Sequence, residues 1–205
     1  GSLGFLPGSA WNEMRREALD KLLEKRSVVQ PHAIHPFEMP VYPAHSVGHI
    51  PELAARFART AQCPADSVEK LQWLVFPITE ADSIPAEWRG KTLLELPRVM
   101  FGKLEAKTAA RLAALKDAGF AGAVVNNPAQ LRYTGGWTLY GGLGLNITNP
   151  MSAARYTSLG LQGMLLQPET ALTAMQAVAP GVPTAALCYG HLPLMLTRAC
   201  PLRNV

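Results

Sequence analysis

Short apolar runs alternate with stretches of helical spacing over most of the chain. This alternation predicts parallel strands joined by right-handed crossover helices. We expect strands at residues 41–47, 71–76, 92–100, 121–125, 139–147, 164–166 and 184–188. We expect helices at residues 51–60, 103–118, 128–133, 150–159 and 169–179. Seven strands are one short of a closed barrel, so the predicted fold class is α/β, an incomplete TIM-like (β/α) barrel.

A helix and a proline-rich linker precede this pattern. Apolar residues from Trp11 to Leu23 recur with a 3.6-residue period, which predicts a helix over 9–26 with Ser9 as its N-cap. Repeated prolines predict that residues 27–51 form a linker, with room for the 41–47 strand alone.

The pattern divides the chain into three parts. Residues 1–2 are typical of a remnant of an expression vector. Residues 3–40 hold the N-terminal helix and the Pro/His-rich linker, and residues 41–205 form the barrel-like domain. Because the eighth strand is missing, we expect that domain to be truncated at its C-terminal end.

Composition narrows the class of protein. The chain has 205 residues, 48% hydrophobic and 17% charged, which is typical of a soluble domain without a membrane span. The net charge is +4, and acids alternate with bases on both charged helices, which favours solvated faces over a nucleic-acid stripe. Cys63, Cys188 and Cys200 cannot all pair, so we expect a cytoplasmic setting. Cys188 lies within an expected strand and is predicted to be in the core.

Polar residues follow several of the expected strands, where α/β barrels keep their sites. Asn126 and Asn146 are candidates for binding a carbonyl or phosphate group. Asn149 stands before Pro150, as Asn127 stands before Pro128, and helix capping explains such an asparagine without a ligand.

Three further residues are candidates for catalysis. Glu169 is the only carboxylate side chain after Asp117, and it suits a general base or a substrate ligand. The alternative is a first-turn glutamate stabilised by the helix dipole. Tyr189 and His191 follow the last expected strand and suit hydrogen bonding or proton transfer, although a histidine there also suits a purely structural role.

Metal sites find little support in the spacing. His32, His35 and Glu38 have suggestive intervals, but the prolines around them exclude the helix that would align them. Cys200 precedes Pro201, a pair found at iron–sulfur ligands and in ordinary loops. Zinc-protease, nucleophile-elbow and phosphate-loop motifs are absent from the sequence.

Five segments together carry a family resemblance. They are Trp11-Asn-Glu-Met-Arg-Arg-Glu-Ala18, Leu96-Pro-Arg98, Gly144-Leu-Asn146 through Asn149, Gln167-Pro-Glu169, and Tyr189-Gly-His-Leu-Pro-Leu-Met195 with Cys200-Pro201. In this order they resemble the collagenase-like peptidases of family thirty-two, whose catalytic type is unassigned. The likeness spans nearly the whole chain and points to the second, C-terminal barrel-like domain of the longer members.

The resemblance implies a pocket and a cofactor. Arg98, Asn126, Asn146 and Asn149 would bind substrate, and Glu169, Tyr189 and His191 would be catalytic. Cys200 would ligate a four-iron, four-sulfur cluster in the full-length parent, with no cofactor expected in this chain. The sequence departs from the family pattern at His191, where arginine is usual, and at Gln167, where serine is usual.

Three functions follow from the resemblance. We expect the isolated domain to be inactive and the parent to take part in iron–sulfur-linked hydroxylation of RNA bases. One alternative is a protease acting on collagen-like or denatured peptides. The other is a non-catalytic domain that packs on the first barrel of the parent. Expected partners are therefore that first barrel and an RNA or peptide substrate, without a membrane, and self-association through the open barrel edge remains an option.

Overall fold

The computed structural model describes residues 4, 7–29, 31–36, 38, 50–178, 181–193 and 195–197. They belong to two compact units, Gly1–Pro40 and Val41–Val205. The first unit contains the helix α1 (Gly8–Ser27), none of whose residues is buried. The predicted Ser9 cap is wrong: α1 begins at Gly8, because the Pro7 carbonyl already accepts the Ala10 amide at 2.9 Å.

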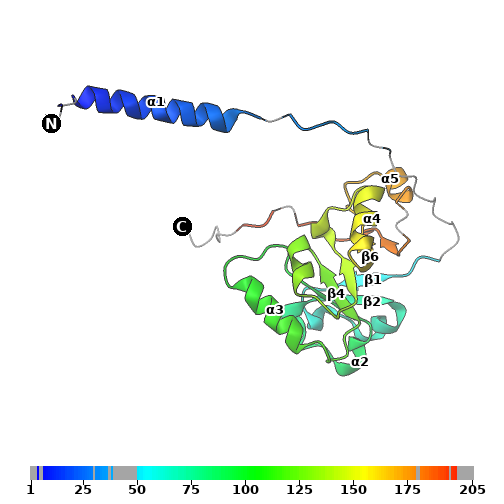
Figure 1. Ribbon diagram of the computed structural model, residues 1–205. Coiled ribbons are helices and arrows are strands. Elements are labelled where there is room, and N and C mark those ends of the chain that lie inside the picture. Colours follow the sequence, from blue (N-terminus) through cyan, green and yellow to red (C-terminus); the bar gives the residue numbers. More distant parts are fainter. Residues whose placement is uncertain are drawn as a thin grey trace. The chain divides into compact units, whose positions relative to one another are not determined.

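The second unit is built on one sheet of seven parallel strands in sequence order (Figure 1). The strands are β1 (Ala54–Arg56), β2 (Trp73–Pro77), β3 (Thr92–Glu95), β4 (Gly122–Val125), β5 (Leu139–Gly141), β6 (Leu161–Leu165) and β7 (Thr184–Ala185). Each strand pairs in parallel with the next one along the chain. The predicted fold class, an incomplete TIM-like barrel with seven parallel strands, is confirmed.

The curl of the sheet is visible in one aromatic contact. The rings of Trp73 on β2 and Tyr140 on β5 lie 5.7 Å apart, centroid to centroid. Two strands separate β2 from β5, and in a flat sheet β2 and β5 would lie about 14 Å apart. The two side chains meet because the sheet bends toward its concave face, as in half of a barrel.

The first strand of the sheet differs from the sequence prediction. The strand expected at 41–47 lies outside the described residues, and the helix expected at 51–60 is wrong because β1 occupies its centre. β1 pairs with β2, and the Phe57 amide just beyond it donates to the Val75 carbonyl at 3.0 Å. Phe57 also stacks on Phe76 at 5.6 Å. Tertiary pairing thus overrides the helical preference of the two alanines in β1.

Helices and 3-10 turns connect the strands. The α-helices are α2 (Ala86–Arg89), α3 (Leu104–Ala114), α4 (Pro150–Ser158) and α5 (Leu172–Gln176). The 3-10 turns are η1 (Thr60–Gln62), η2 (Ala65–Lys70), η3 (Ile78–Glu80), η4 (Pro128–Arg132) and η5 (Leu143–Leu145). Among the helices of the described residues, none is long and apolar enough to cross a membrane.

Two of these connections begin as the sequence predicts. The Asn127 side chain accepts the Ala129 amide at the start of η4, and the Asn149 side chain accepts the Ser152 amide at the start of α4. Two boundaries differ. β5 ends at Gly141, so the expected strand 139–147 is too long. Glu169 lies in a turn before α5, whose N-cap is Ala171, so the first-turn placement is wrong.

The core forms a continuous apolar row across the sheet. Phe76, Leu94, Ala123, Leu139 and Leu161 lie opposite one another on successive strands, and all are buried. Leu112 of α3 belongs to the same core and is fully buried.

Cys188 was expected in this core, and that placement is wrong. β7 ends at Ala185, so Cys188 lies beyond the strand, where its side chain is exposed.

We expect Leu112→Ala to lower the free energy of unfolding by about 2–5 kcal/mol, because it opens a cavity in this core. Leu104→Ala on the same helix is the matched control, since Leu104 is 42% exposed. Its cost should stay near 0.5 kcal/mol or below. Urea unfolding of both variants measures the difference, and equal losses would contradict the assigned core.

Candidate functional site

A pocket of about 180 Å³ lies at the carboxyl edge of the sheet. Its walls come from the segments that follow β3, β5, β6 and β7. The lining residues are Arg98, Leu143, Gln167, Pro168, Glu169, Leu192 and Pro193. Parallel sheets present their ligand sites at this edge, because the loops after all strands meet there.

Two residues singled out from the sequence meet in this pocket. Arg98 follows β3 and is half-buried, and Glu169 follows β6 and is exposed. Neither side chain makes a hydrogen bond or ion pair with the residues that the structure describes. A half-buried guanidinium without an anion is poorly compensated for lost hydration. An anionic ligand group would supply charge-assisted hydrogen bonds to it.

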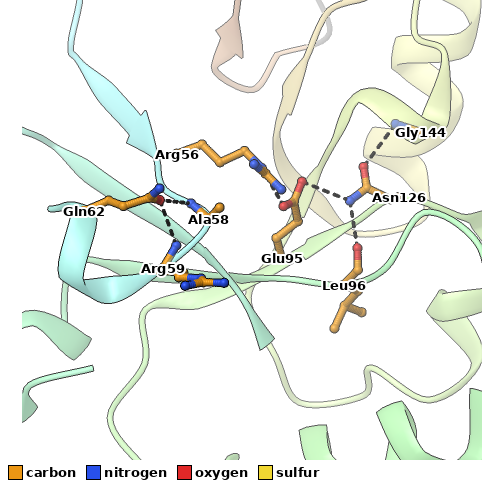
Figure 2. Close-up of polar contacts among 8 residues, drawn as sticks. All are labelled: Arg56, Ala58, Arg59, Gln62, Glu95, Leu96, Asn126 and Gly144. Atoms are coloured by element: carbon orange, nitrogen blue, oxygen red, sulfur yellow. Dashed lines mark hydrogen bonds and ion pairs between the residues drawn. The ribbon is translucent and has the colours of Figure 1, made fainter. Parts of the chain in front are cut away.

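Asn126 ties two walls of the pocket together (Figure 2). Its side chain is almost fully buried at the end of β4. The Nδ2 amide donates to the Leu96 carbonyl at 2.9 Å, and Oδ1 accepts the Gly144 amide at 3.0 Å. Leu96 leads to Arg98, and Gly144 adjoins Leu143. The structure therefore uses both ends of this carboxamide to position the pocket walls.

The loop after β5 needs glycine where it passes Asn126. A Cβ atom on Gly142 would overlap the Asn126 side chain, and one on Gly144 would overlap the Asn126 backbone carbonyl. The close approach explains why the loop reads Gly142-Leu-Gly144.

An ion pair beside the clamp was missed by the sequence analysis. Arg56 Nε at the end of β1 lies 2.7 Å from Glu95 Oε2 at the end of β3, and Glu95 Oε1 lies 3.5 Å from Asn126 Nδ2 (Figure 2). The Glu95 side chain is 19% exposed. Glu95 is the one carboxylate in an otherwise apolar strand, and this was the available signal. Its partner was hidden by the helix expected around Arg56.

Tyr140 places a phenol on the concave face. Burial raises the pKa of this phenol above its usual value, so the group remains a neutral hydrogen-bond donor at physiological pH.

The remaining predicted residues lie at varied places. Asn146 has a left-handed backbone, with φ of 50°, and its Oδ1 accepts Gln167 Nε2 at 3.2 Å. Asn149 caps α4. Tyr189 is 97% exposed and His191 is exposed, and neither lines the pocket, although Leu192 does. Cys200 lies outside the described residues.

The described part of the chain contains no group of three or more His, Cys, Asp or Glu residues able to hold a metal ion. His32, His35 and Glu38 are exposed and lie outside any helix, as their prolines predict. Of the cysteines, Cys63 is buried and Cys188 is exposed.

Comparison with known protein families, with curated proteins and with solved structures found no match. The resemblance to family thirty-two therefore stays a prediction.

We expect Asn126→Ala to lower the free energy of unfolding by about 2 kcal/mol or more, because it leaves the Leu96 carbonyl and the Gly144 amide without partners. Hydrogen exchange at the Gly144 amide should accelerate. Asn149→Ala serves as the control, since it removes an exposed helix cap worth about 1 kcal/mol and leaves Gly144 exchange unchanged. Native stability and exchange in the Asn126 variant would contradict the clamp.

Gly144→Ala tests the close approach from the other side. The added methyl group collides with backbone, which cannot rotate away, so we expect a loss of more than about 1 kcal/mol. Gly135→Ala is the matched control, because a Cβ atom there meets open space. Thermal unfolding compares the two variants, and a Gly144 variant as stable as the Gly135 variant would refute the steric argument.

Proposed function

We propose that the pocket at Arg98 binds RNA, with one base inserted, and that this domain is the substrate-binding barrel of an RNA-base-hydroxylating protein similar to family thirty-two. One observation carries the proposal: a half-buried guanidinium without a protein partner faces a pocket that also contains an amide and a carboxylate. Phosphate oxygens and base carbonyl groups are natural acceptors for Arg98.

The pocket lining suits a nucleobase. Gln167 and Glu169 offer the donors and acceptors that proteins use to read base edges, and Leu143, Leu192 and Pro193 offer apolar surface for the faces of a ring. The volume of about 180 Å³ is below the range of about 300–1,000 Å³ for drug-sized ligands. A single ring fits this size better than a peptide segment does.

Hydroxylation itself requires chemistry beyond these side chains. The resemblance assigns it to an iron–sulfur cluster held from Cys200 onward. Cys63 and Cys188, the cysteines within the described residues, differ in burial and join no ligand group, so they do not fit a cluster. We assign no reaction step to such a group, and we propose that the isolated domain binds substrate without turning it over.

A peptidase is the second candidate, and Glu169 favours it. This carboxylate is exposed and makes no hydrogen bond with the described residues, so it is free to act as a general base on water. The described lining contains no serine, threonine or cysteine, so covalent acyl transfer has no nucleophile in this pocket.

We expect Arg98→Ala to weaken binding of a fluorescein-labelled single-stranded RNA at least tenfold, which corresponds to about 1.4 kcal/mol. Fluorescence anisotropy with the whole chain measures this. Arg132→Ala is the control, because Arg132 is exposed and paired with Glu105, and its affinity should stay within about twofold of the parent chain.

Three outcomes would count against the proposal. The first two are an Arg98 variant that binds like the parent chain and a parent chain that binds no RNA. Digestion of denatured collagen that disappears in Glu169→Gln would favour the peptidase instead. The cluster is tested separately, by iron and sulfide analysis of a protein extended past Val205 and purified without oxygen, beside its Cys200→Ser variant.

A further inference from the structure

The charges of α1 are separated onto opposite sides of the helix. Glu13, Glu17, Asp20 and Glu24 follow one another at intervals of four, three and four residues, which places all four acids in one row. A second row, at the same intervals, contains Arg15, Leu19, Leu22 and Arg26. Trp11 lies one turn before Arg15 and extends this second row, which we call the basic-apolar face. The helical repeat places the acidic row directly opposite it.

The basic-apolar face lacks a cover among the described residues. Trp11 is 57% exposed, Leu19 is 52% exposed and Leu22 is 51% exposed. Arg15 and Arg26 form no ion pair with any residue that the structure describes, because the acids of their own helix lie on its far side. Helices gain most of their stability from packing an apolar face, so α1 would be stabilised by a partner on this side.

We propose that the basic-apolar face of α1 docks into an apolar groove rimmed by carboxylates on another protein. The charge distribution selects this occupant. Trp11, Leu19 and Leu22 would fill the groove, and carboxylates at its rim would pair with Arg15 and Arg26 through bidentate hydrogen bonds. The acidic row would face water, away from the carboxylates of the partner.

Two other occupants fit this face less well. A second copy of the chain would bring Arg15 and Arg26 against their own kind, and like charges in an apolar contact repel. A lipid surface prefers basic residues along the polar side of a helix. Here Arg15 and Arg26 lie within the apolar row, and the acidic row holds the polar side.

Calcium-loaded calmodulin is a suitable probe, because it presents an apolar groove with an acidic rim to basic amphipathic helices. We expect the whole chain to bind it, with a blue shift of tryptophan emission that disappears in Trp11→Phe. The double variant Arg15→Glu with Arg26→Glu should bind at least tenfold more weakly. Glu13→Gln with Glu24→Gln is the matched control on the acidic row, and its affinity should remain within about threefold.

Helix content by circular dichroism confirms that each variant keeps α1. The proposal is overturned if calmodulin does not bind, or if the arginine double variant binds as well as the parent chain. Equal or tighter binding to phosphatidylserine vesicles would assign the face to lipid. A concentration-dependent dimer in analytical ultracentrifugation, lost when Leu22 is changed to Ser, would assign it to a second copy. This test concerns α1 alone, so its result is independent of the RNA proposal.

Discussion

Parallel pairing of every strand with its successor is the constraint on which the barrel-like unit depends. Each pair needs a crossover that returns the chain to the same end of the sheet, and this requirement places helices or 3-10 turns between strands. It also brings the carboxyl ends of all strands to one edge. Arg98, Leu143, Glu169 and Leu192 share a pocket for that reason, although they belong to four different connections.

A buried asparagine stabilises this edge where the backbone cannot. The loops after β3 and β5 leave the sheet and lose their ladder partners there. Asn126, at the end of the strand between them, supplies one donor and one acceptor, and the glycines of the second loop allow it to approach. A carboxamide suits this position because it offers both functions without a charge to desolvate. The cost of burying it is offset by full pairing.

Charges without partners connect the two proposals. Most charged side chains of a folded domain are hydrated or paired. Arg98 in the pocket and Arg15 and Arg26 on α1 are different, because each lies beside apolar surface and has no acid within reach among the described residues. A ligand phosphate in the first case, and carboxylates of a protein in the second, would complete these surfaces.

The sequence by itself determined the fold class. Alternating apolar runs and helical spacing indicate the strand count, and Asn127-Pro128 and Asn149-Pro150 mark helix starts, because periodicity and capping are local properties. Local signals also sufficed to select Arg98 and Glu169, since both follow strands.

Only the tertiary structure decided how these parts combine. It made residues 54–56 a strand, because β2 offers backbone partners that an isolated segment lacks. It paired Arg56 with Glu95 and turned Asn126 into a clamp, because such contacts join residues far apart in the chain. It exposed Cys188, because β7 ends at Ala185. Long-range pairing of this kind has no local signature, since it depends on which strand ends the curled sheet brings together.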